Sequence, residues 1–163
     1  AFIRDIVFHE RPQVHPRGNE RTAMSQQVFI DTNIWVYSYD DRFPEKQQLA
    51  RDLLEHLTLS ENAYISTQVM QEFCSVMLTK VKTMDGDELI DVIETTLQPY
   101  LTHIPSTSFY QRGIRLYHSA SLQFYDALIV QAALDLGCTT LYSEDLQHGQ
   151  TFGSLTVVNP FFA

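Results

Sequence analysis

Short runs of apolar residues alternate along this chain with longer stretches in which apolar residues recur every three or four positions. The short runs predict buried strands at 27–31, 63–66, 139–142 and 155–158, and a weaker one at 101–104. The longer stretches predict helices that begin at about 32, 44, 67, 89, 106 and 124. Because continuous apolar strands alternate with helices, we expect an α/β fold with a parallel or mostly parallel sheet covered on both faces.

The pattern changes abruptly at Met24. Residues 1–23 contain two prolines, two histidines and four arginines and show no sustained periodicity. We interpret 1–23 as a leader or a non-native tail, and 24–163 as one folded domain. The length of 163 residues agrees with a single domain, since domains commonly have about 100 to 200 residues.

Composition excludes several classes of protein. A hydrophobic content of 44% argues against disorder, and no apolar run reaches the roughly 18 residues of a membrane span. The start of the chain lacks the order of a secretory signal, which favours a cytoplasmic protein without a membrane partner. The two cysteines are far apart and have no C-x-x-C spacing, so they predict neither a disulfide framework nor a zinc knuckle.

The net charge of -9 is the opposite of the basic surface expected of a non-specific nucleic-acid binder. A nucleic-acid substrate would therefore need positive charge from another source, and a bound divalent metal would supply it.

Four acids map to the edge of the predicted sheet where the strands end, and this edge is where ligands bind in α/β folds. Asp31 closes the first strand, Glu72 lies on the helix after the second, Asp126 begins the buried helix, and Asp145 follows the strand at 139–142. Each acid alone has an ordinary explanation as a helix cap, a solvated helical residue or a turn residue. Their joint placement indicates a functional site.

Electrostatics favours a cation among these acids. Two carboxylates about 5 Å apart repel by roughly 3 kcal/mol at an effective dielectric near 20. Mg²⁺ relieves this repulsion because it prefers oxygen ligands and combines one or two carboxylates with a substrate phosphate. A bound ion also lowers the pKa of a water and neutralises charge on a leaving oxygen. The pattern is typical of a nuclease or a phosphatase.

Four segments resemble those of PIN domains, and most closely the VapC-type ribonuclease toxins of toxin–antitoxin pairs. They are FIDTNIWVY around Asp31, TQVMQEF with Glu72, LQFYDALIVQAAL with Asp126, and LYSEDLQHG with Asp145, followed by VVNPF. The resemblance spans residues 27–161 and keeps the order of the family. It implies a three-layer α/β/α sandwich, an endoribonuclease dependent on Mg²⁺ or Mn²⁺, frequent homodimerisation, and an antitoxin protein that blocks the site.

The resemblance also implies roles for single residues. Asp31, Glu72, Asp126 and Asp145 would hold one or two metal ions, and one of these acids would help to deprotonate the attacking water. Asn33 or Ser143 would orient these ligands through hydrogen bonds. On the helix at 106–119, Arg112 and Arg115 are three residues apart and could approach RNA phosphates, although a solvated helical face explains them more simply.

Two alternatives remain at this stage. A haloacid-dehalogenase-like, Mg²⁺-dependent phosphatase also starts with an acid after the first strand, but it needs a second acid two residues later, where this chain has Asn33. A catalytically inactive PIN scaffold that binds RNA or protein is the non-enzymatic alternative. Since all four acids are present, the sequence gives no sign of such a loss of activity.

Overall fold

The structure is a computed structural model that describes residues 26–58 and 62–162, and the predicted leader at 1–23 lies outside these residues. Its centre is a six-stranded sheet in the order β3-β2-β1-β4-β6-β5. The strands are β1 (Val28–Ile30), β2 (Ala63–Ser66), β3 (Leu101–His103), β4 (Thr140–Tyr142), β5 (Thr151–Phe152) and β6 (Leu155–Val158). All neighbouring strands pair in parallel except β5 and β6, which are antiparallel.

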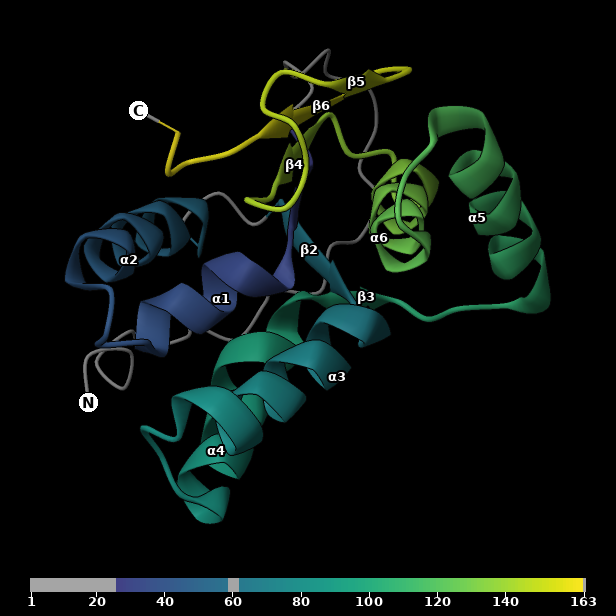
Figure 1. The fold of residues 1–163 in the computed structure, drawn as a ribbon. Coiled ribbons are helices and arrows are strands. Elements are labelled where there is room, and N and C mark those ends of the chain that lie inside the picture. Colours follow the sequence, from purple (N-terminus) through teal and green to yellow (C-terminus); the bar gives the residue numbers. More distant parts are fainter. Residues whose placement is uncertain (1–25, 59–61, 163) are drawn as a thin grey trace, which may run out of the picture.

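Helices cover both faces of the sheet (Figure 1). The first three connections contain α1 (Thr32–Tyr39) with α2 (Pro44–Thr58), α3 (Thr67–Val76) with α4 (Gly86–Val92), and α5 (Thr107–Ala120) with α6 (Phe124–Asp135). In Figure 1, α1 to α4 lie on one side of the sheet and α5 and α6 on the other. The predicted α/β fold with a mostly parallel sheet is therefore confirmed.

The boundaries differ from the prediction in two places. The helix expected from 89 begins at Gly86, because the Asp85 carboxylate accepts a hydrogen bond from the Glu88 amide at 2.9 Å and the Glu88 carboxylate accepts one from the Asp85 amide at 3.0 Å. This reciprocal capping satisfies two free N–H groups of the first turn. Strand β5 was not predicted, since its two residues are too few to show an alternating pattern.

Helices α3 and α4 continue beyond their regular parts. A π-helical turn, η1 (Met77–Val81), extends α3, while η2 (Ile93–Leu97) and the 3-10 turn η3 (Gln98–Tyr100) extend α4 as far as β3. Lys82 follows η1 in the left-handed conformation with φ of 56° and ends that helix. In the described part of the chain, no helix combines the length and apolar character that crossing a membrane requires.

The core lies between the sheet and both helical layers. Phe29, Leu141 and Val157 from the strands are fully buried, as are Trp35 from α1 and Phe73 from α3. On the other face, every residue of α6 from 127 to 133 is buried, as its continuous apolar sequence predicts. Burial on this scale, at roughly 25 cal/mol per Å² of apolar surface, fixes the positions of the strand ends that carry the site.

A crevice is expected where the strand order reverses. The chain moves from β1 to β2 on one side through α1 and α2, and it later reaches β4 on the other side of β1 through α5 and α6. Connections on opposite faces leave the carboxyl ends of β1 and β4 uncovered between them. Asp31 and Ser143 directly follow these two strands.

Candidate active site

Asp31 is held in the crevice by the start of α1. It caps this helix, because its Oδ1 accepts a hydrogen bond of 2.7 Å from the Thr32 amide. The Asp31 amide donates to the Tyr142 carbonyl at 3.0 Å, which continues the pairing of β1 with β4. The residue is only 6% exposed. Asp31 is therefore a buried carboxylate in a fixed position.

The loop after β4 is joined to Asp31 by two side chains. The Ser143 hydroxyl donates to Asp31 Oδ2 at 2.6 Å, and the Asn33 amide nitrogen lies 3.3 Å from the same oxygen. Asn33 also donates to Asp145 Oδ2 at 3.1 Å, while its own oxygen accepts from the Glu144 amide at 3.3 Å. Asn33 and Ser143 thus contact the acids that the sequence predicted them to orient.

Glu72 reaches the same edge from α3. The Thr32 hydroxyl donates to its Oε2 at 2.9 Å, and the Gln68 amide donates to its Oε1 at 2.8 Å. The Gln68 nitrogen also contacts the Tyr125 carbonyl at 3.2 Å, which ties α3 to the start of α6. Each oxygen of the Glu72 carboxylate therefore has a donor, and the carboxylate lies beside α1.

Asp126 lies in the first turn of α6 and is half-buried. Burial raises its pKa, and the negative charges of Asp145 and Glu72 raise it further. The Gln68 amide, which donates to Glu72, also donates to the carbonyl of Tyr125, the residue before Asp126, so Asp126 lies close to Glu72. Asp126 therefore belongs to the same cluster.

The charge state of Asp31 shows the same coupling. Burial raises its pKa from 3.8 to about 7, the hydrogen bonds from Ser143 and Thr32 oppose this rise, and the charges of Asp145 and Glu72 add to it. Asp31 and Asp126 are thus both electrostatically coupled to Glu72 and Asp145. A cation among them would relieve both the repulsion and the cost of burying a carboxylate.

The acids do not form a preassembled metal cage. Within residues 26–58 and 62–162, no group of three or more His, Cys, Asp or Glu side chains is close enough to hold an ion. The carboxylate oxygens of these acids instead accept hydrogen bonds. Ser143 donates to Asp31, Asn33 to Asp145, and Thr32 and Gln68 to Glu72. The set of oxygen donors fits a hard divalent ion.

A cleft of about 410 Å³ opens beside these acids. Its lining includes Glu72, Asp145 and Asn33, and also Arg42 and Phe43. A polymeric substrate lying in this cleft would be close to both carboxylates and to a cation. The cleft thus connects the acidic cluster with one of the few positive charges on this acidic protein.

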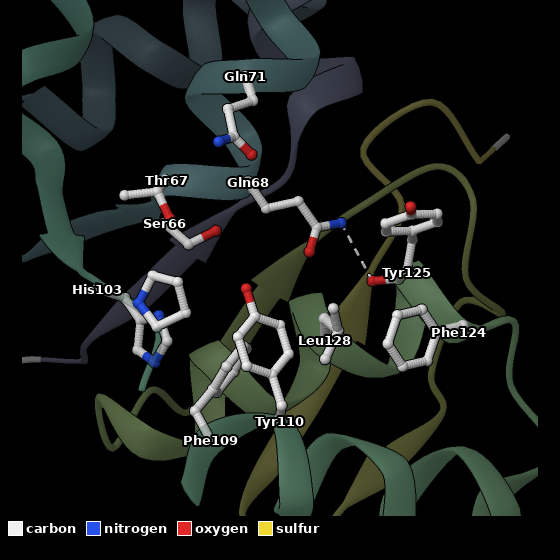
Figure 2. A pocket seen from close by; sticks show the side chains of 11 residues that line it. Ser66, Thr67, Gln68, Gln71, His103, Phe109, Tyr110, Phe124, Tyr125 and Leu128 are labelled. Carbon is white, nitrogen blue, oxygen red and sulfur yellow. Dashed lines mark hydrogen bonds between the residues drawn. The ribbon is translucent and has the colours of Figure 1, made fainter. Parts of the chain in front are cut away.

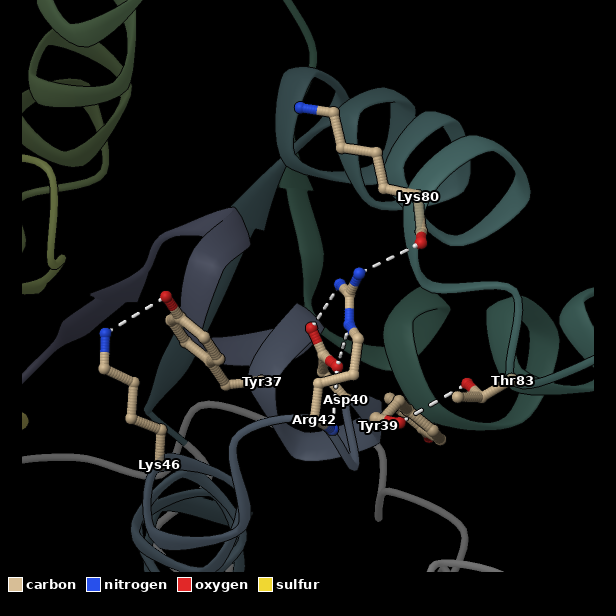
Figure 3. Close-up of polar contacts among 7 residues, drawn as sticks. All are labelled: Tyr37, Tyr39, Asp40, Arg42, Lys46, Lys80 and Thr83. Atoms are coloured by element: carbon tan, nitrogen blue, oxygen red, sulfur yellow. Dashed lines mark hydrogen bonds and ion pairs between the residues drawn. The ribbon is translucent and has the colours of Figure 1, made fainter.

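Two cations near this cleft are held in place by neighbours, as Figure 3 shows. The Arg42 guanidinium donates to both oxygens of Asp40 at 2.7 Å and to the Lys80 carbonyl at 3.3 Å. Lys46 contacts the Tyr37 hydroxyl at 3.1 Å and forms an ion pair with Glu144. Both positive groups are therefore fixed around α1 rather than free in solvent.

The two arginines that the sequence put forward for phosphate binding lie elsewhere. Arg112 forms an ion pair of 2.6 Å with Asp135, the last residue of α6, and Arg115 is an exposed residue of α5. Asp126 lies in the first turn of α6, nine residues before Asp135, which corresponds to about 14 Å along the helix axis. Their role in substrate binding stays a prediction, and the structure gives Arg112 a structural contact.

Thr32 and Gln68 were not found from the sequence, although both touch Glu72. The spacing of four residues between Gln68 and Glu72 on one helix was a signal that could have identified Gln68. Thr32 gave no such signal, because its contact with Glu72 joins residues 40 positions apart.

A family profile, described as PIN domain, matches residues 28–151. This match covers most of the chain and includes all four acids. The chain belongs to the PIN domain family.

Solved structures show the same fold. A toxin–antitoxin complex from Klebsiella pneumoniae matches with a TM-score of 0.59 and 21% identity, over 83% of this chain and 98% of the other. The FitAcB crystal structure from Neisseria gonorrhoeae matches with a TM-score of 0.55 and 17% identity, over 84% of this chain and 100% of the other. At these identities the likeness concerns the fold. No curated protein matches the chain significantly.

Proposed function

We propose that this protein is an endoribonuclease that depends on a divalent metal and acts as the toxin of a type II toxin–antitoxin pair. The observation that carries the proposal is the convergence of Asp31, Glu72, Asp126 and Asp145, from four separate elements, on the crevice at the ends of β1 and β4. PIN domains are a family of nucleases, and the matched region contains all four acids.

The four acids would hold one or two Mg²⁺ or Mn²⁺ ions. When bound, the metal would supply an activated water, a bridge to the phosphate, and charge neutralisation on the leaving oxygen. Carboxylates are the ligands that these ions prefer. Burial raises the pKa values of Asp31 and Asp126, so a nearby positive charge would stabilise the ionised forms of these two carboxylates.

The surrounding residues position the acids. Ser143 fixes one oxygen of Asp31, and Asn33 spans Asp31 and Asp145, so that the ends of β1 and β4 stay in register. Thr32 and Gln68 set the direction of the Glu72 carboxylate from two sides. Groups of this kind orient metal ligands, and their loss typically costs about 10- to 100-fold in affinity or activity.

RNA as substrate and an antitoxin as partner rest on the family and on relatives. The matched structure from Klebsiella pneumoniae is a toxin–antitoxin complex. We infer a cognate antitoxin that closes the acidic cleft, a homodimer as the assembled toxin, and action in the cytoplasm. The acidic cluster favours an antitoxin segment with positive charge at this place.

Two other functions predict different results. An inactive PIN scaffold would bind RNA or protein without cutting, and a Mg²⁺-dependent phosphatase would release phosphate from a monoester without cutting a chain. Asn33 stands where the phosphatase needs its second acid, and it donates hydrogen bonds to two carboxylates instead.

Cleavage of single-stranded RNA with Mg²⁺ or Mn²⁺, monitored by gel, tests the proposal. The parent protein is expected to cut. Asp31→Asn and Asp126→Asn are expected to lose at least about 100-fold in cleavage activity, which is the largest loss typical of removing a group that only orients a metal ligand. Asp52→Asn is the matched control, because Asp52 is an exposed residue of α2 away from the site. Full cleavage by either site variant, or none by the parent with any divalent ion, contradicts the proposal.

A further inference from the structure

A second cavity, of about 260 Å³, is lined by the first turns of α3, next to the part of this helix that lines the cleft described above. It is enclosed by the end of β2 and the first turns of α3 on one side, and by α5 and α6 on the other (Figure 2). Its lining consists of Ser66, Thr67, Gln68, Gln71, His103, Pro105, Phe109, Tyr110, Phe124, Tyr125 and Leu128.

Aromatic rings form much of the wall. Tyr110 is 43% exposed, Phe124 38% and Tyr125 65%. Neighbouring rings hold them in place, because Phe109 and Tyr110 lie edge to face at 5.2 Å and Phe124 and Tyr125 at 5.5 Å. The cavity thus presents ring faces that a planar ligand can stack on without reordering the protein.

Polar groups with unused hydrogen-bonding capacity stand between the rings. The Gln68 nitrogen is engaged by Glu72 and by the Tyr125 carbonyl. Among the residues that the structure describes, its amide oxygen and the Tyr110 hydroxyl have no hydrogen-bond partner, and Figure 2 shows both directed toward the same space. An acceptor and a hydroxyl beside ring faces match a flat ligand that has hydrogen-bonding groups on its edge.

The charge of the lining indicates which part of a nucleotide fits. None of the described residues that form the cavity is Lys or Arg, and His103 lies 3.5 Å from the Asp135 carboxylate, so the lining offers a phosphate no Lys or Arg side chain. Pockets for drug-sized ligands occupy about 300–1,000 Å³. A cavity of about 260 Å³ is smaller and suits a single ring system.

The cavity is directly linked to the acidic cluster. Gln68 forms part of the wall and also hydrogen-bonds to Glu72, one helical turn away. Tyr125, another wall residue, immediately precedes Asp126. A ligand in the cavity would therefore lie next to whatever the acids bind.

We propose that this cavity binds one unpaired base of a single-stranded RNA, next to the phosphodiester at the acidic cluster. The proposal rests on the proposed function as a ribonuclease and adds how the substrate is held. Stacking on Tyr110 and its neighbouring rings supplies affinity, and the Gln68 oxygen and Tyr110 hydroxyl contact the edge of the base. A paired base is already stacked in a helix, so the site selects single strands.

Fluorescence anisotropy tests this inference without cleavage. Labelled ten-nucleotide oligouridylate and oligoadenylate are compared with an abasic ribose-phosphate strand of equal length, in chelator and at low salt. The parent is expected to bind at least one base-containing strand about ten-fold more tightly than the abasic strand. Tyr110→Ala is expected to lose this preference, whereas Tyr110→Phe keeps the ring and most of the preference.

Phe162→Ala is the control, since Phe162 is an exposed ring that stacks on His148 and is not part of the cavity. It is expected to bind like the parent. Because Tyr110 is exposed, Tyr110→Ala is expected to fold, and its melting curve checks this. Equal binding of all strands by the parent, or an unchanged preference in Tyr110→Ala, overturns the inference.

The cleavage assay separates this inference from the proposed function. A parent that cuts RNA but does not distinguish bases from abasic sites overturns the base pocket alone. A parent that neither cuts nor binds RNA overturns both. If the cavity instead receives a side chain of a protein partner, the base-containing and abasic strands should bind equally well.

Discussion

The Ser143 hydroxyl lies 2.6 Å from Oδ2 of Asp31, a hydrogen bond between residues that are 112 positions apart. Ser143 itself is fully buried and follows β4, as Asp31 follows β1. This bond is among the causes that lower the pKa of Asp31 against the larger effect of burial. Ser143 therefore favours the ionised form of the carboxylate, which is the form that binds a metal.

We expect Ser143→Ala to weaken Mn²⁺ binding by about 10- to 100-fold, measured by isothermal titration calorimetry at pH 7. Ser38→Ala is a closely matched control. Ser38 is also a fully buried serine and donates a 2.7 Å hydrogen bond, but to the Trp35 carbonyl. Both variants lose a buried hydrogen bond, at a cost of about 1 kcal/mol. Equal Mn²⁺ affinity in the two variants would show that Ser143 has only a structural role.

The pH dependence of stability should reveal the buried charge of Asp31. Its pKa is about 7 in the folded chain and near 3.8 ordinarily, so between these values the folded state keeps a proton that the unfolded state has released. In chelator, this group therefore makes the protein less stable as the pH rises from about 4 to 7, by on the order of a few kcal/mol.

Asp31→Asn removes this titration and retains an oxygen that can cap Thr32. We expect it to melt at a higher temperature than the parent in chelator at pH 8, and the difference to shrink toward pH 4. Thermal melts of the parent, Asp31→Asn and Asp52→Asn across this range measure the effect. A constant difference between Asp31→Asn and the parent would refute the assignment of the charge.

The pair of Arg42 and Asp40 predicts the opposite pH trend. Asp40 is almost fully buried, and its hydrogen bonds with Arg42 lower the pKa of its carboxyl group. This contribution to stability is present above about pH 4 and is lost as the pH falls through the lower, folded-state pKa. Arg42→Ala should therefore melt at a lower temperature than the parent at pH 7.

The deficit of Arg42→Ala should shrink toward pH 3, because protonation of the Asp40 carboxyl group at low pH removes the ion pair from the parent. Arg115→Ala, which removes an exposed cation on α5, controls for the change in net charge and should melt like the parent. A deficit that stays the same from pH 7 to pH 3 would mean that lost packing, and not the ion pair, explains it.

Alanine substitutions at two helical glycines test how closely α5 packs against α6. A Cβ at Gly113 of α5 would lie 2.5 Å from Leu128 Cδ2, whereas a Cβ at Gly86, the first residue of α4, would meet no atom within 4 Å. We expect Gly113→Ala to lose stability, since overpacking costs about 1–3 kcal/mol and the gain in helix propensity is about 1 kcal/mol. Gly86→Ala should be neutral or slightly stabilising in urea titrations. Equal stability of the two variants would contradict the close contact of α5 with α6.

The sequence predicted the strands and helices well where the pattern was long or continuous. The apolar run that became β1 and the largely apolar helix α6 were both found, because their burial leaves almost no polar face. The antiparallel β5 was missed, since its existence depends on pairing with β6 and not on its own two residues. The order of the strands in the sheet also had no signal in the periodicity.

The candidate site was partly predictable for the same reason. Acids that directly follow strands, such as Asp31, must lie at one edge of a parallel sheet. The partners that fix these acids depend on contacts between distant elements. Thr32 touches Glu72 across 40 positions, and Arg112 pairs with Asp135 only because α5 packs on α6. Helical spacing alone did not indicate that Arg112 pairs with Asp135.

A crystal of the protein grown with Mn²⁺, measured for anomalous scattering, tests the central claim most directly. We expect a manganese peak among the carboxylates of Asp31, Glu72, Asp126 and Asp145, with at least two of them within coordination distance, and no peak there in Asp31→Asn. A map of the parent that shows no peak at the ends of β1 and β4, with manganese elsewhere or nowhere, would contradict the account.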